Sequence, residues 1–199
     1  MQTNCLKDKL DKEIISCKKC GLHELNFNKN KIELGYGKLV GKEGKISNQI
    51  IVVGLNPSHN RFKNLSYPFD ADMKSEKDND GKTFMKLLMR LGVYDFCYIT
   101  NAIKCSTENN KVDDESFEYC KEYFIEEFKL TYPDLIIACG NQTYNYIFSI
   151  LQLLTNIKDV KLDKIFHPSY CFSYKRIAIK DYILHVRDVF KRNGMDCTL

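Results

Sequence analysis

The stretch that decides the fold is Ile50-Ile51-Val52-Val53, followed at once by Gly54-Leu55-Asn56-Pro57-Ser58. Its apolar half is continuous instead of alternating, which is typical of a strand buried on both faces of a parallel sheet. Three more short apolar runs have the same character, at 97–100, 135–138 and 164–166. Helical apolar faces lie between or after them, at 84–91, 117–128, 144–151 and 179–190, and Asp114 is the predicted N-cap of the second. This alternation predicts an α/β fold: a three-layer α/β/α sandwich around a four-stranded parallel sheet.

Length and composition favour one domain spanning residues 1–199. Hydrophobic residues make up 44% of the chain and charged residues 28%, which is ordinary globular composition and argues against disorder or a coiled coil. No apolar run approaches the roughly 18 residues of a membrane span, and the start of the chain has no hydrophobic signal core. We therefore expect a cytoplasmic protein with no membrane partner, and a monomer.

The net charge of +4 hides an uneven distribution. Residues 108–127 hold eight acidic and two basic side chains, whereas residues 161–192 hold eight basic and three acidic ones. A basic C-terminal third suits a polyanion. The alternative is an ordinary solvated face rich in lysine, and composition alone favours that interpretation.

The loops that follow the predicted strands should carry the chemistry, because ligands of open parallel sheets bind beyond the carboxyl ends of the strands. Three of the four loops contain groups that bond a base or position a water molecule. These loops are residues 54–58, 101–105, 140–142 and 167–170.

Nine cysteines are many for such a chain, and an odd count without a secretion signal argues against a disulfide scaffold. Cys17 and Cys20 form a Cys-x2-Cys pair that can hold a metal or the edge of a cluster. Cys105 follows the second predicted strand, and Cys120 lies on the apolar face of the next helix, so the two could complete a four-thiolate set. The alternative for Cys120 is an ordinary core cysteine, which is our interpretation of Cys97 and Cys139.

In this order, these segments resemble the uracil-DNA glycosylase superfamily, specifically its iron–sulfur branch. The resemblance covers nearly the whole chain. The matching segments are Cys17-Lys18-Lys19-Cys20-Gly21-Leu22-His23, Val53-Gly54-Leu55-Asn56-Pro57, Tyr67-Pro68-Phe69, Thr100-Asn101-Ala102-Ile103-Lys104-Cys105, Cys120, residues 134–140 and His167-Pro168-Ser169-Tyr170.

The resemblance implies a monofunctional DNA glycosylase that hydrolyses the N-glycosidic bond of uracil, or of a related altered pyrimidine, and leaves an abasic site. It implies a [4Fe–4S] cluster on Cys17, Cys20, Cys105 and Cys120, with zinc as the alternative metal. The base must be flipped out of a duplex or presented in a single strand. The implied roles are a donor to the base oxygen (His167), stacking on the base (Phe69), an amide that reads its polar edge (Asn101), backbone contact with the base (Leu55) and DNA contacts (Ser169, Tyr170, Phe172, Lys175 and Arg176).

The first loop departs from the usual Gly-Glu-Ala-Pro-Gly of the iron–sulfur branch. Its Gly-x-Asn-Pro form is closer to the mismatch-specific and single-strand-selective branches, so we assign Asn56 to positioning the water. A polar insertion at about 71–80, expected to be a loop, also distinguishes this chain. These departures leave two alternatives to uracil excision: a glycosylase for a modified pyrimidine such as a phage-DNA base, or a non-catalytic metal-containing module that binds DNA.

Overall fold

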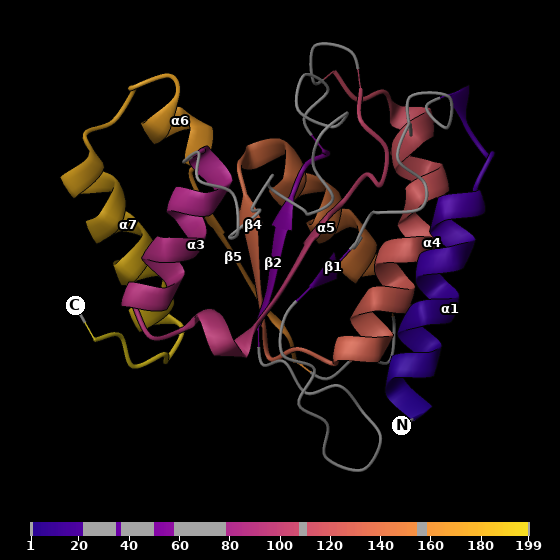
Figure 1. The fold of residues 1–199 in the computed structure, drawn as a ribbon, viewed down its shortest axis with the longest axis horizontal. Coiled ribbons are helices and arrows are strands. Elements are labelled where there is room, and N and C mark those ends of the chain that lie inside the picture. The colour runs from indigo at the N-terminus through magenta and orange to yellow at the C-terminus, as the bar shows by residue number, and fades with distance from the viewer. Residues whose placement is uncertain are drawn as a thin grey trace.

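A single five-stranded sheet organises the protein (Figure 1). The computed structural model describes residues 2–21, 35–36, 50–57, 79–107, 111–154 and 159–198. The strands lie in the order β1-β3-β2-β4-β5, and the four long ones are parallel to their neighbours. Their bounds are β1 Gly35–Tyr36, β2 Ile50–Gly54, β3 Cys97–Asn101, β4 Leu135–Cys139 and β5 Lys161–Ile165. The predicted four-stranded parallel sheet is therefore confirmed, and the antiparallel two-residue β1 at the β3 edge is an addition that no sequence pattern indicated.

Helices cover both faces of the sheet, as the three-layer prediction required (Figure 1). One face packs on α3 (Asp80–Arg90), α6 (Pro168–Phe172) and α7 (Ile179–Arg192), and the other packs on α4 (Asp114–Thr131) and α5 (Asn141–Leu153). A 3-10 turn, η3 (Tyr94–Phe96), leads into β3. Along β2, Ile50 and Val52 enter the first core while Ile51 and Val53 enter the second. Burial on both faces explains why this strand is apolar without alternation.

Helix α1 (Gln2–Ser16) forms an outer element against α4 and was not predicted. Its buried contacts come mainly from Leu10 and Ile14, which pack on Tyr123 of α4. A helix held by so few apolar side chains carries a weak periodic signal. Among the described residues, no helix is both long and apolar enough to cross a membrane.

The fourth strand was predicted in the wrong place. It runs over Lys161–Ile165 instead of 164–166, and Phe166 lies beyond it with its ring exposed. Strand β5 is the edge strand next to β4, so its side chains are largely exposed and need not be apolar. A search for apolar runs therefore found only its buried end.

The N-cap of α4 is Asp113 and not the predicted Asp114. The Asp113 carboxylate accepts a hydrogen bond from the Ser116 amide at 2.7 Å, which satisfies one of the free N–H groups of the first turn. Asp114 lies within the helix. Two adjacent aspartates give the same capping signal, so only the backbone geometry separates them.

We predict that Asp113→Ala lowers the free energy of unfolding by about 1 kcal/mol, because it removes this cap. Asp114→Ala is the matched control and should change it by less, since Asp114 accepts no capping bond. Urea unfolding followed by circular dichroism measures both. A larger loss for Asp114→Ala would contradict the assignment.

Candidate active site and cysteine centre

The carboxyl ends of the four parallel strands meet at one edge of the sheet. Gly54 at the end of β2 pairs with Asn101 at the end of β3, and Cys139 at the end of β4 pairs with Ile165 at the end of β5. Strands are about 4.8 Å apart, so the ends of β3 and β5 are separated by roughly 14 Å. That span accommodates a pyrimidine together with the side chains that reach it.

Hydrogen bonds join the loops at this edge in pairs. The amides of Ala102 and Ile103 donate to the carbonyls of Gly54 and Leu55, each at 2.8 Å, which ties the first loop to the second. On the other side, the Gly140 amide donates to the Ile165 carbonyl at 2.8 Å. These bonds extend the hydrogen bonding of the sheet into the loops that carry the predicted site residues.

His167 is the N-cap of α6, directly after β5. Its Nδ1 accepts from the Ser169 amide at 3.3 Å and lies 2.7 Å from the Ser169 hydroxyl. Because Nδ1 is an acceptor, the neutral ring carries its proton on Nε2. Burial lowers the pKa of His167, and the charge of Asp80 opposes that shift. The ring is thus a neutral Nε2–H donor near neutral pH.

The segment around His167 is packed against the core. The buried Tyr182 donates its hydroxyl to the Phe166 carbonyl at 3.0 Å, immediately before His167. Gly140 has a φ of +97°, and an added Cβ there would be in ordinary van der Waals contact with the His167 Cβ, at 4.0 Å. The backbone on either side of the imidazole is therefore fixed.

Asn56 is half-buried and uses only the donor half of its amide within the described residues. Its Nδ2 donates to the Pro57 carbonyl at 3.1 Å and to the Thr107 hydroxyl at 3.0 Å. Both bonds fix the plane of the amide, so the orientation of Oδ1 is set as well. An oriented Oδ1 can accept a hydrogen bond from a water molecule but cannot act as a strong base.

Asn101 is 5% exposed at the end of β3. Within the part of the chain that the structure describes, its side-chain amide makes no hydrogen bond, although a buried amide ordinarily has a partner. An amide both donates and accepts, as the edge of a pyrimidine requires. Its environment therefore suits a group that binds a ligand.

A buried ion pair lies next to the main chain of Asn101. The Lys104 ammonium is 2.6 Å from the Glu127 carboxylate, and the two side chains are 2% and 1% exposed. Glu127 also accepts from the Thr100 and Tyr98 hydroxyls at 2.8 and 3.3 Å. Burial raises the pKa of Glu127 while the Lys104 charge lowers it. Sequence reasoning quoted Lys104 within a motif but gave it no role, because its partner is 23 residues away.

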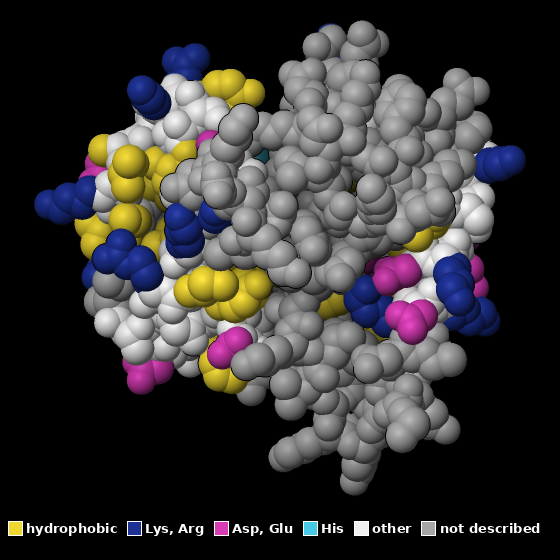
Figure 2. Space-filling view, in the orientation of Figure 1, with side chains coloured by type: hydrophobic (Ala, Val, Ile, Leu, Met, Phe, Trp, Pro, Cys, Tyr) yellow, Lys and Arg dark blue, Asp and Glu magenta, His cyan; other side chains and the backbone are white. Residues whose placement is uncertain are grey.

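The segment after His167 presents side chains of two kinds. Tyr170 is 43% exposed, and Lys175 and Arg176 are also exposed. Phe172 instead packs on the core, edge-on to Tyr182 with 5.4 Å between ring centroids. Of the two aromatic residues predicted to contact DNA, Tyr170 is thus the more exposed. Figure 2 shows basic and hydrophobic side chains gathered on the left of the molecule, over α3, α6 and α7.

Of the four predicted cysteine ligands, Cys120 lies on α4 and Cys105 lies on the connection that leads to it from β3. Cys17 and Cys20 are close enough to affect the Cys120 thiol electrostatically, and burial raises its pKa. Cys97 and Cys139 lie in the sheet core, as predicted.

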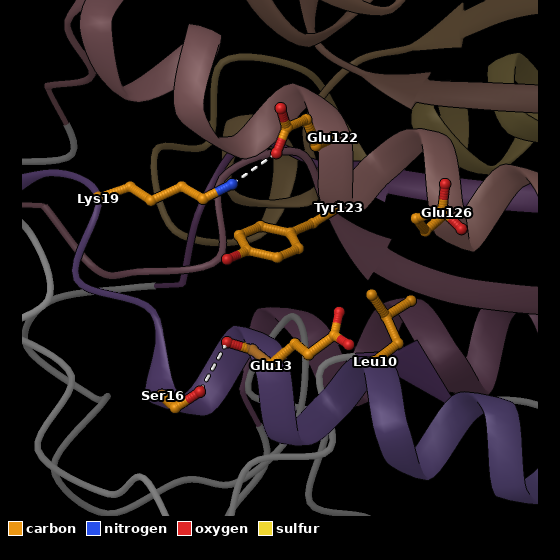
Figure 3. Close-up of a pocket in the computed structure, with 7 residues that line it drawn as sticks. All are labelled: Leu10, Glu13, Ser16, Lys19, Glu122, Tyr123 and Glu126. Carbon is orange, nitrogen blue, oxygen red and sulfur yellow. Dashed lines mark hydrogen bonds and ion pairs between the residues drawn. The ribbon is translucent and has the colours of Figure 1, made fainter.

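Two contacts attach the Cys17–Cys20 turn to α4 (Figure 3). Lys19 pairs with Glu122 at 2.5 Å and lies 5.3 Å from the centroid of the Tyr123 ring. Cys17 packs against the apolar cluster that includes Tyr123. An open pocket between α1 and α4 adjoins this turn and includes Glu13. The turn is therefore anchored beside Cys120.

The predicted donor set consists of four thiols from three separate segments, and thiolates are ligands of both zinc and iron–sulfur clusters. In the described ranges, no three acidic, histidine or cysteine side chains are spaced to hold one metal ion. A [4Fe–4S] cluster binds each of four thiolates through a different iron, so its ligands would surround a larger object.

Two predictions fall on residues that the structure does not describe. Phe69, the predicted stacking residue, lies outside the described ranges, as does most of the predicted insertion at 71–80. The end of the insertion is described: Asn79 caps α3 by accepting from the Lys82 amide at 2.7 Å, and Asp80 begins the helix.

Comparisons with known proteins agree with this geometry. The family model of the uracil DNA glycosylase superfamily matches residues 42–191, about three-quarters of the chain. The chain belongs to the uracil-DNA glycosylase superfamily. Among its relatives in the superfamily, the Type-4 uracil-DNA glycosylase of Archaeoglobus fulgidus is 29% identical over 181 residues, covering 81% of each chain. That of Sulfurisphaera tokodaii is 28% identical over 175 residues, covering 86% of this chain and 70% of the relative.

A solved structure shows the same superfamily fold. SMUG2 of Pedobacter heparinus superposes with a TM-score of 0.59 at 12% identity, and the match covers 94% of this chain and 97% of that one. The resemblance to the superfamily and to its iron–sulfur branch is thus confirmed by the relatives, and the α/β architecture by the fold.

We predict that the pKa of His167 lies below its ordinary value of 6.5 and falls further in Asp80→Asn, because the Asp80 charge favours the imidazolium. His185 is an internal control: its pKa is also lowered by burial, but Asp80 does not contribute. NMR titration of the ring protons measures both. A His167 pKa at or above 6.5, or a rise in Asp80→Asn, would contradict this account of its environment.

Proposed function

We propose that the protein is a monofunctional uracil-DNA glycosylase that carries a [4Fe–4S] cluster and hydrolyses the N-glycosidic bond of uracil in DNA. The observation that carries this proposal is the placement of a neutral Nε2–H donor, a buried amide and an oriented amide oxygen at one edge of the sheet. Membership of the superfamily and the Type-4 relatives support it.

In the proposed reaction, catalysis depends mainly on stabilising the leaving base. As the glycosidic bond lengthens, positive charge grows on the sugar and negative charge on the pyrimidine. A donor aimed at the base oxygen stabilises that anion, as an oxyanion hole does. In the proposed mechanism His167 donates through Nε2, and because its ring is already neutral it makes this bond without losing a proton.

Asn101, Leu55 and Asn56 have separate roles in the proposal. The Asn101 amide pairs with the polar edge of the pyrimidine, and the Leu55 amide contacts the base, since its carbonyl is already bonded to Ile103. The Oδ1 of Asn56 orients the attacking water. Phe69 is proposed to stack on the base.

The basic segment after His167 is the proposed DNA contact. Tyr170 enters the strand at the flipped nucleotide, and Lys175 and Arg176 neutralise phosphates. Phe172 supports this segment from the core, where it packs on Tyr182. Ser169 holds His167 through its hydroxyl and its amide, and it is proposed to lie against the DNA with the rest of this segment.

The cluster is proposed to be structural. Cys17, Cys20, Cys105 and Cys120 would hold it, and the cluster would join the segment after α1 to the start of the β3–α4 connection. The Lys19–Glu122 pair and the packing of Cys17 against the cluster that includes Tyr123 would keep the first two ligands near α4.

A uracil-containing oligonucleotide should become alkali-labile at the uracil after incubation with the protein. His167→Ala should slow this cleavage about 100- to 1,000-fold, because it removes the donor to the leaving base. Asn56→Ala should slow it about 100-fold through loss of the oriented water. Gel analysis of the cleaved strand measures both.

Asn145→Ala is the matched amide control, since Asn145 is exposed on α5. It should leave the rate unchanged. Full activity in both His167→Ala and Asn56→Ala would contradict the proposed mechanism. Release of a modified pyrimidine but not of uracil, from a panel of oligonucleotides, would favour the alternative substrate.

Anaerobically purified protein should be brown and contain about four irons per chain, as one [4Fe–4S] cluster requires. Cys120→Ser should reduce the iron content, whereas Cys139→Ala should keep it, because Cys139 lies in the sheet core. Metal analysis and visible absorption measure this. A colourless protein that contains zinc would refute the cluster assignment.

A further inference from the structure

The buried ion pair of Lys104 and Glu127 has no role in the mechanism proposed above. Removing two charges from water is costly, and a buried pair of this kind adds little net stability compared with apolar side chains. Both side chains are nevertheless almost fully buried and 2.6 Å apart. The role of this pair is therefore better inferred from its hydrogen bonds than from the stability that its charges add.

Each proton of the Lys104 ammonium has an acceptor. Besides Glu127, the ammonium donates to the Thr100 hydroxyl at 3.0 Å and to the Asn101 carbonyl at 2.7 Å. An ammonium has three donors, so its hydrogen-bonding capacity is filled and its position is fixed. Glu127 holds the other side of this network, because it also accepts from Thr100.

The bond to the Asn101 carbonyl fixes the residue proposed to read the base. On the other side of the same peptide, the Ala102 amide donates to the Gly54 carbonyl at 2.8 Å. The peptide plane after Asn101 is thus held at both its oxygen and its nitrogen. Only the side-chain torsions of Asn101 remain adjustable, and its amide has no partner among the described residues.

The same lysine lies next to a predicted cluster ligand in the chain, because Cys105 follows it directly. Its partner Glu127 lies about two turns after Cys120 on α4. The Lys104–Glu127 pair therefore joins the end of β3 to α4, the helix that carries Cys120.

We propose that Lys104, held by Glu127, is a positioning residue that sets the backbone of Asn101 and thereby the amide that pairs with the pyrimidine. This inference rests on the proposed glycosylase function. It assigns the ion pair to base recognition and departure, and not to DNA affinity, which the phosphate contacts supply.

The test is the double variant Lys104→Met with Glu127→Gln, which removes both charges without leaving either one buried alone. Its kcat for uracil release should fall about 10- to 100-fold, the range expected when a reacting group is misplaced by about 1 Å. Inhibition by free uracil should weaken with it, while KM for the oligonucleotide and the iron content stay at parental values. A purely structural pair would not separate kcat from KM in this way.

The matched control is Asp163→Asn with Arg192→Met, which neutralises an ion pair of 2.7 Å between β5 and α7. It should keep parental kcat and uracil inhibition. Thr100→Val is the second variant: it keeps both charges, removes one hydroxyl from the network and should show the same effects to a smaller degree. If the double variant loses iron or does not fold, Thr100→Val tests the proposal in its place.

Parental kcat and parental inhibition by uracil in the folded, iron-loaded variants would overturn the proposal. Absence of uracil release by the unmodified protein is a different outcome, because it rejects the glycosylase function itself.

Discussion

The parallel pairing of β2 with β3 on one side and β4 on the other is the constraint on which the rest of the structure depends. It places Gly54 beside Asn101 and so brings loops from distant parts of the chain to one edge. The β4–β5 pairing adds the segment that carries His167. A one-residue slip in this register would turn every side chain of β2 to the opposite face, so the two buried cores hold the register in place.

The connection from β3 to α4 carries residues of both predicted centres. It begins at the edge where a base would bind, and it includes Cys105, one of the predicted cluster ligands. The ammonium of Lys104 bonds the Asn101 carbonyl and Glu127 of α4, so this connection is tied to the helix that carries Cys120.

Sequence reasoning succeeded where burial on both faces leaves a continuous apolar run, as in β2, β3 and β4, and it placed Asn56, Asn101 and His167 at strand ends because topology brings such ends together. It failed where tertiary contacts decide. The edge strand β5 needs few apolar side chains, and neither β1 nor α1 has a strong pattern. The Lys104–Glu127 pair and the packing of Phe172 on Tyr182 depend on contacts between separate elements, which no local spacing encodes.

The central claim is that the edge of the sheet between β3 and β5 binds a pyrimidine beside a neutral imidazole. A crystal structure of the protein with free uracil tests it most directly. The account predicts the ring of uracil between these strand ends, with the Asn101 amide on its polar edge and the Nε2 of His167 within hydrogen-bond distance of its O2. Uracil bound elsewhere, or an imidazole whose Nε2 points away from the ring, would contradict it.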